Sequence, residues 1–177
     1  MARVIQLRSS IVERLHTTKE WAAKIVGGEG ILDACKRKSV GCALLRVDYF
    51  PYYAMAQTHN GPSRYPHVCT NEVGNCGCSH AEPRAVMSAL RTIGKYNYVG
   101  VKLLCLCQYS PCTTCANILI DSGLICGCVY ETLTKHDRRG AQFLSEVMPV
   151  LSLKELTSGG AKTLDALEQW GSISSER

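Results

Sequence analysis

The sequence has no run of about 18 apolar residues, the length needed to cross a bilayer, so no membrane span is expected. Its first residues also lack the apolar core of a signal peptide, because polar Gln6, Arg8, Ser9 and Ser10 interrupt them, and export is not expected. Neither an internal repeat nor a low-complexity segment occurs. A chain of 177 residues with a hydrophobic fraction of 46% is therefore predicted to form one cytoplasmic domain with a sizeable core.

The net charge of +5 is mild, which fits an anionic small substrate or a nucleic acid but demands neither. Cysteine, in contrast, is abundant, with eleven residues. Without an export signal, these thiols are more consistent with metal ligation and buried free cysteines than with disulfides. Five of them lie in strand-like segments and are predicted to be small buried hydrophobes: Cys42, Cys105, Cys107, Cys126 and Cys128.

Two short motifs carry residues suited to chemistry. The first is the H-x-E of His80 and Glu82, and the second is a P-C-x-x-C that contains Cys112 and Cys115. One imidazole and two thiolates can bind zinc and leave the fourth position to a water, whose pKa the metal lowers. Glu82, a carboxylate outside the ligand set, would then move protons to and from the substrate.

Either motif alone is compatible with a different kind of protein. His80 could be a core histidine beside an unrelated thiol pair, and C-x-x-C pairs also occur in redox proteins and structural zinc sites. A redox pair, however, would need neither His80 nor Glu82. The order of the two motifs, the proline before Cys112 and the apolar run leading into it together favour a catalytic zinc site.

The hydrophobic pattern predicts how the elements alternate. Strands are expected over residues 40–47, 51–57, 101–107, 124–130 and 150–153. Helices are expected over 4–15, 17–26, 82–93, 112–119, 142–148 and around 164–170, with a linker over 157–160. A capping box from Thr17 to Glu20 would open the second helix, Gly94 would close the third, and Pro111 would lie in the first turn of the fourth. This order predicts a mixed sheet with helices on both faces. His80 and the cysteine pair would open two neighbouring helices whose N-termini point at one spot.

From about residue 21 to 153 the sequence resembles the cytidine deaminase superfamily, and most of all its deoxycytidylate (dCMP) deaminase branch of phage and bacterial type. The resemblance is carried by the two motifs above, by Ser39-Val40-Gly41 and by His59-Asn60-Gly61. It implies a three-layer α/β/α fold with a five-stranded mixed sheet, a homo-oligomer, and a bacterial or phage-infected cell. It also implies a zinc-dependent hydrolase that converts dCMP to dUMP with release of ammonia. Residues 1–157 would form the deaminase domain, with a helical region over 1–30, and residues 158–177 a tail with a short helix.

The resemblance also assigns roles to residues. His80, Cys112 and Cys115 would bind the catalytic zinc, and Glu82 would shuttle the proton. The sugar would contact Asn60, the base would contact the backbone N–H of Ala81, and Ser110 is grouped with these substrate contacts. Cations for a phosphate are available as Arg64, Lys135, Arg138 and Arg139, although each of them is equally compatible with a solvated charged loop. His136 is interpreted as a surface residue.

The sequence departs from the branch pattern at two places. His59 stands where the branch has tyrosine, and Leu133-Thr134 stand where an aromatic residue often follows the fourth strand. A base modified at C5, or a different phosphate state, stays open, as does regulation by a nucleoside triphosphate.

A second, structural zinc is predicted at Cys35, Cys69, Cys76 and Cys78, with His67 as the alternative fourth ligand. Three of the four thiols crowd into a short glycine-containing segment before His80. Some phage-type dCMP deaminases are similar here, because they carry an additional zinc with ligands at the places of Cys35 and Cys78. Free thiols in a reducing cytosol are the alternative.

Two other functions compete with a mononucleotide deaminase. A deaminase of tRNA or single-stranded DNA would use aromatic and basic groove residues. Only two Phe and two Trp occur, which leaves Tyr52, Tyr53 and Tyr65 as stacking candidates and disfavours this alternative. A non-catalytic zinc module would have no use for Glu82.

Overall fold

The central sheet is built from the apolar runs of the sequence. The structure, a computed structural model, describes residues 2–27, 35, 38–62, 69–70, 77–134 and 137–172. Its main sheet has the order β2-β1-β5-β6-β7, with the bounds Tyr53–His59, Gly41–Arg46, Leu103–Tyr109, Ile125–Thr132 and Val150–Ser152. β1 runs antiparallel to both β2 and β5, whereas β5, β6 and β7 are parallel. β3 (Gly61–Pro62) and β4 (Cys78–Ser79) form a separate antiparallel pair.

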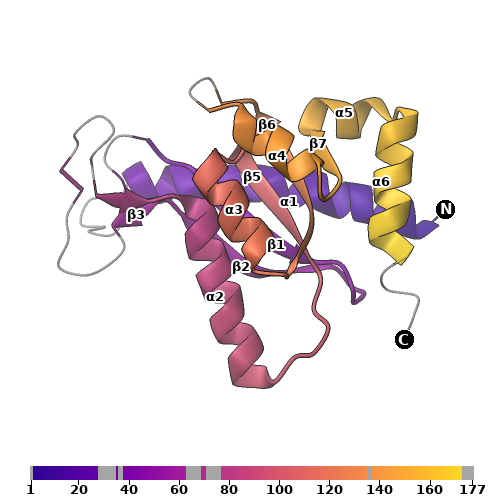
Figure 1. Cartoon of the computed structure of the whole chain (residues 1–177), viewed down its shortest axis with the longest axis horizontal. Helices are drawn as coiled ribbons and strands as arrows, with labels where there is room; N and C mark the ends of the chain where they lie inside the picture. The colour runs from indigo at the N-terminus through magenta and orange to yellow at the C-terminus, as the bar shows by residue number, and fades with distance from the viewer. Residues whose placement is uncertain are drawn as a thin grey trace.

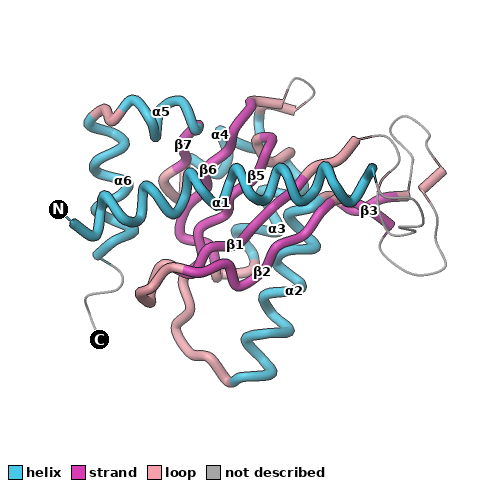
Figure 2. Tube along the Cα trace, turned by 180° about the vertical axis from the view of Figure 1, so that it is seen from behind, coloured by secondary structure: helices cyan, strands magenta, loops and turns pink. Residues whose placement is uncertain are grey.

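Helices cover both faces of this sheet (Figure 1). One face packs against α2 (Ala81–Tyr96), α3 (Thr113–Asp121) and α4 (Arg139–Ser145), and the other against α1 (Ala2–Gly27), α5 (Leu153–Ser158) and α6 (Ala161–Ser172). Figure 2 shows α1 running across the face of the sheet that lies opposite α2 and α3. Each face has its own hydrophobic cluster, because successive strand residues point to opposite sides. The prediction of a three-layer α/β/α fold with a five-stranded mixed sheet is confirmed.

The strand cysteines lie where small apolar side chains are needed. Cys42, Cys105, Cys107 and Cys128 are buried on the face covered by α2 and α3. The sulfur atoms of Cys42 and Cys105 are 3.8 Å apart, as are those of Cys107 and Cys128. Cys126 is half-buried and donates its S–H to the carbonyl of Leu103. Four of the five are thus buried as predicted.

The N-terminal region differs from the prediction of two helices over 4–15 and 17–26. α1 is one continuous helix, and Thr17 lies inside it with its hydroxyl donating to the carbonyl of Arg14. The predicted capping box at Thr17 to Glu20 is therefore wrong. The reason is packing, since a stripe of buried side chains runs without a break through that point: Leu7, Ile11, Leu15, Thr18 and Ala22.

The other helix ends also depart from the sequence prediction. Gly94 lies inside α2, which ends instead at Asn97 in the left-handed conformation (φ 54°). Residues 153–158, expected to end a strand and begin a linker, form α5, which Ser152 and Glu155 open with a true capping box. The predicted helix of the C-terminal tail is present as α6. Its Trp170 is fully buried on the sheet, so α6 shares the main core, while the division of the chain at residue 157 stays a prediction.

In the part of the chain that is described, none of the helices combines the length and apolar character of a membrane span.

We predict that Gly127→Ala destabilises the protein because β6 approaches the Trp170 indole too closely for a side chain. A Cβ at Gly127 would lie 2.3 Å from Trp170 Nε1, which donates to the carbonyl of Cys126 at 3.1 Å. Overpacking of this kind costs about 1–3 kcal/mol of the free energy of unfolding, measurable by urea titration.

Gly94→Ala is the matched control, because a Cβ at that helical position meets nothing within 4 Å. It should raise the free energy of unfolding by about 0.5–1 kcal/mol. Equal unfolding midpoints for the two variants would contradict the close approach of Trp170.

Candidate functional site

Two helices begin at the same place beside the sheet. His80 is the N-cap of α2 and Cys112 is the N-cap of α3, both with extended backbone, and neither side chain caps its own helix. Both side chains are thereby available to turn toward each other. Pro83 lies in the first turn of α2. Pro111 precedes the N-cap of α3, so the prediction that it opens that helix is corrected.

Three potential metal ligands meet at these helix starts. His80 Nδ1 lies 3.6 Å from the sulfur of Cys112 and 3.3 Å from that of Cys115. In a tetrahedral site with bonds of about 2.0 Å to nitrogen and 2.3 Å to sulfur, the nitrogen–sulfur separation is about 3.5 Å. The predicted ligand set is thus brought together in a geometry that fits zinc.

The protonation of the two thiols supports the same conclusion. Hydrogen bonds from Cys115 and His80 lower the pKa of Cys112 to about 4, which makes it a thiolate at neutral pH. The pKa of Cys115 is raised well above its usual value because it donates to Cys112 and is buried. A metal would take the place of that shared proton and leave both sulfurs as thiolates.

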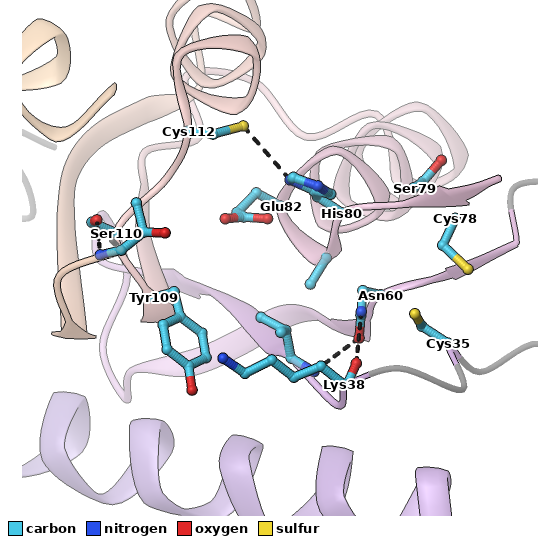
Figure 3. Close-up of a pocket in the computed structure, with 13 residues that line it drawn as sticks. Cys35, Lys38, Asn60, Cys78, Ser79, His80, Glu82, Tyr109, Ser110 and Cys112 are labelled. Atoms are coloured by element: carbon cyan, nitrogen blue, oxygen red, sulfur yellow. Dashed lines mark hydrogen bonds between the residues drawn. The ribbon is translucent and has the colours of Figure 1, made fainter. Parts of the chain in front are cut away.

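Glu82 stands beside this group without belonging to it. Its side chain is only 5% exposed, and burial raises its pKa to about 7. Cys115 Sγ lies 3.7 Å from Glu82 Oε2. Figure 3 shows the carboxylate reaching into the cavity between His80 and Ser110. A carboxyl group with a pKa close to neutral can both accept and return a proton.

A cavity of about 400 Å³ opens next to these residues. Its wall includes Ala81, Asn60 and Ser110, three of the predicted substrate contacts. The structure therefore brings together the predicted catalytic and substrate residues that lie in its described part, apart from Arg138. The volume is in the range of small-molecule sites.

The side chain of Asn60 is already tied to the backbone. Its Oδ1 accepts from the N–H of Val40 and its Nδ2 donates to the carbonyl of Lys38, both at 2.8 Å. Each group keeps one further hydrogen-bonding position. Asn60 thus holds residues 38–40 beside the cavity, and contact with a sugar stays a prediction.

Ser110, like Asn60, both lines the cavity and holds a backbone segment beside it. Its hydroxyl oxygen accepts from the N–H of Thr134 at 2.9 Å, which holds the loop after β6 against the cavity. A second loop residue, Asp137, accepts from both the N–H and the hydroxyl of Thr113, and these bonds lower the pKa of Asp137. Sequence reasoning missed this cap on α3. The only cue was an aspartate within the polar segment after β6.

The predicted phosphate cations are less well placed. Arg138 and Arg139 are exposed and line no part of the cavity, and Arg139 Nε lies 3.9 Å from Asp137 Oδ1. Arg64, Lys135 and His136 lie outside the described residues. Two lining residues that sequence reasoning missed are Lys38 and Tyr109. They flank the Ser39-Val40-Gly41 and Ser110-Pro111-Cys112 segments, and that proximity was the available cue.

The two departures from the branch pattern have different outcomes. His59 does not line the cavity. It is buried, with its ring 5.5 Å from that of Trp21 in α1. Thr134 does line the cavity, in the loop that Ser110 holds.

A second group of thiols lies at one end of the cavity. The sulfur atoms of Cys35, Cys69 and Cys78 are all within 4.8 Å of one another, and Cys35 and Cys69 are 3.9 Å apart. Cys35 and Cys78 also line the cavity, with their sulfur atoms turned toward each other (Figure 3). Three of the four predicted ligands of a second zinc are thus together. Cys76 and His67 lie outside the described residues.

Comparison with known families identifies this arrangement. Residues 20–132 match the model of the cytidine and deoxycytidylate deaminase zinc-binding region. The chain belongs to this deaminase family. The family model describes a zinc-binding deaminase, and the group of His80, Cys112 and Cys115 is compatible with binding zinc. A comparison with curated proteins gave no match.

Solved structures show the same fold. A dCMP deaminase from the cyanophage S-TIM5, in complex with dCMP and dUMP, has a TM-score of 0.58 at 22% identity, covering 81% of this chain and 96% of that one. A guanine deaminase from Nitrosomonas europaea has a TM-score of 0.52 at 16% identity, covering 90% and 83%. Similar folds in the deaminase family thus serve both pyrimidine and purine substrates, so the substrate must be argued from the site.

We predict that Asn60→Ala lowers stability, because it removes two hydrogen bonds that hold residues 38–40. The free energy of unfolding should fall by about 1–2 kcal/mol in urea titration. Asn117→Ala, at an exposed position on α3, is the control and should change it by less than about 0.5 kcal/mol. Equal effects would show that the Asn60 amide does not anchor the segment.

Proposed function

We propose that the protein deaminates deoxycytidine 5′-monophosphate, or a counterpart modified at C5, to the corresponding deoxyuridine nucleotide with release of ammonia. The observation that carries this proposal is the buried Glu82, with a pKa near 7, between a three-ligand metal group and a cavity. The family supports deamination of a pyrimidine. The dCMP and dUMP bound by the cyanophage enzyme support a deoxynucleotide monophosphate.

His80, Cys112 and Cys115 would hold zinc, which when bound lowers the pKa of a water molecule. Glu82 takes one proton from the attacking water and passes it to the ring nitrogen, and it then takes the remaining hydroxyl proton and passes it to the departing amino group. One water is consumed, the C4 amino group leaves as ammonia, and the carboxylate is restored. Burial of Glu82 keeps bulk water away from this proton transfer.

The remaining lining groups orient the substrate. As the first residue of α2, Ala81 has an N–H without a partner inside the helix, and it can donate to the base. Thr58 donates to the Ala81 carbonyl at 2.7 Å and so fixes this turn. The unused positions on Asn60 and Ser110 can bind the sugar and base.

A polynucleotide substrate fits less well. In the β1–β2 ladder, Gly41 pairs with His59 at one end and Arg46 pairs with Tyr53 at the other. Tyr53 and its neighbour Tyr52, two of the stacking candidates, therefore lie away from the cavity. Tyr65 is outside the described residues. Among the described residues that line the cavity, Tyr109 is the only Phe, Tyr or Trp. A purely structural zinc module is disfavoured because Glu82 occupies the cavity beside the metal group.

A homo-oligomer in the cytoplasm is part of the same proposal. Large apolar side chains are exposed along α2 and the segment that follows it, where a second copy could cover them: Met87, Leu90, Tyr96, Tyr98 and Val99.

We also propose a second, structural zinc at Cys35, Cys69 and Cys78, with Cys76 or His67 as the fourth ligand. Metal analysis of the purified chain should give two zinc ions. Cys78→Ser should lose the structural zinc and keep the catalytic one, and His80→Ala should lose the catalytic zinc and keep the structural one. Cys126→Ser, outside both groups, should keep two. A wild type that binds only one zinc ion, and keeps it in Cys78→Ser, would contradict the second site.

Ammonia release from a panel of nucleosides, mononucleotides and oligonucleotides tests the function. We expect turnover of deoxycytidine 5′-monophosphate to exceed that of guanine, deoxycytidine and cytosine-containing oligonucleotides. Glu82→Gln removes the proton acceptor and keeps the side-chain volume, and it should lower kcat by about 10²–10⁴-fold with zinc retained.

The zinc content of the Glu82→Gln protein is the control for loss of the metal centre. Near-normal turnover by the metal-loaded variant would contradict the mechanism. Preference for a purine or an oligonucleotide would contradict the substrate.

A further inference from the structure

One positively charged side chain lines the cavity. Among the described residues that line it, Lys38 is the only lysine or arginine. It lies just before β1, three residues after Cys35. Figure 3 shows its side chain extending along the cavity toward Tyr109.

The backbone that carries Lys38 is fixed on both sides. The Lys38 carbonyl accepts from Asn60 Nδ2, and the N–H of Val40 donates to Asn60 Oδ1. The carbonyl of Asn60 in turn accepts from the N–H of Cys35 at 3.1 Å. The segment before β1 is therefore anchored to the end of β2, and Lys38 starts from a defined position.

The head of the side chain has a defined place as well. Lys38 Nζ lies 3.6 Å from the centroid of the Tyr109 ring, the last residue of β5. Within the described part of the chain, no carboxylate lies within 4.0 Å of this ammonium. An aromatic face attracts a cation less strongly than an anion does, so the ammonium can exchange the ring for an anionic group.

The groups that line the cavity correspond to the parts of a nucleotide. Glu82 stands where the base reacts, Asn60 where the sugar is expected, and Lys38 is bound to Asn60 through its carbonyl. A mononucleotide has a base, a sugar and an anionic phosphate for these three groups to bind. The exposed Arg138 and Arg139 line no part of this path.

We propose that Lys38, held over Tyr109, binds the 5′-phosphate of the substrate and sets the preference for a nucleotide over a nucleoside. This inference rests on the proposed function and adds a residue that specifies the substrate. A phosphate monoester carries nearly two negative charges at neutral pH, and Lys38 supplies one charge-assisted hydrogen bond to it. In the absence of substrate, the Tyr109 ring holds the Lys38 ammonium against the wall of the cavity.

The test measures kcat/KM for deoxycytidine 5′-monophosphate and for deoxycytidine, and takes their ratio. Lys38→Met removes the charge and keeps the length of the side chain, so the ratio should fall by about 10- to 100-fold. Lys38→Arg keeps the charge and should restore most of it. Lys154→Met makes the same charge change at an exposed position on α5, outside the cavity, and should leave the ratio unchanged.

A merely structural role for Lys38 predicts a different result. Damage to the fold would lower kcat/KM for both substrates equally, and an unchanged ratio in Lys38→Met would overturn the proposal. Ionic strength gives an independent measure: kcat/KM for the nucleotide should fall with added salt more steeply in the wild type than in Lys38→Met. Equal salt dependence would also count against Lys38.

Failure of the proposed function is separable from failure of this inference. If the zinc-loaded wild type deaminates no cytosine mononucleotide, the function is wrong, and Lys38 is then tested by calorimetric titration with dUMP and with inorganic phosphate. Binding that weakens in Lys38→Met and persists in Lys154→Met supports the phosphate site. Equal binding by the two variants, or no binding by the wild type, overturns it.

Discussion

The structure depends on one constraint, which is that two helix starts must meet at a single point. His80 and Cys112 are N-caps of different helices, and their side chains come together because α2 and α3 pack side by side on the same face of the sheet. β4 leads into His80 and β5 leads toward Cys112, so the ends of two strands fix where the helices begin. The partial positive charge of both helix starts favours thiolates at the same spot. Loss of contact between α2, α3 and the sheet would separate the ligands.

The same packing gives Glu82 its chemistry. It follows the buried Ala81, and the α2 face that includes Ala85 lies on the sheet above Cys42 and Cys105. Small side chains let the helix come close, and that closeness excludes water from the carboxylate. Desolvation then raises the pKa of Glu82 to about 7. Burial thus gives Glu82 a pKa at which a carboxyl group can both accept and release a proton near neutral pH.

Local pattern predicted the site better than it predicted the helices. His80, Glu82, Cys112 and Cys115 were found because their chemistry requires fixed spacing within short motifs. Two similar cap signals had opposite outcomes: Thr17 to Glu20 lies inside α1, whereas Ser152 to Glu155 opens α5. The local sequence alone does not distinguish the true capping box from the false one. The first is overridden by a buried stripe that continues through Thr18, and the second follows the extended backbone of β7.

Lys38 and Tyr109 lie far apart in the sequence, and no local pattern could pair them. Their meeting depends on how the end of β5 faces the segment before β1, which only the sheet order decides. That segment also carries Cys35, whose backbone and side chain reach Asn60 and Cys69. On the other side, β3 and β4 pair Gly61 with Ser79, which brings Cys78 to the same place. A metal at these thiols would therefore hold the segment that presents Lys38, so that a structural group at one end of the cavity helps to shape it.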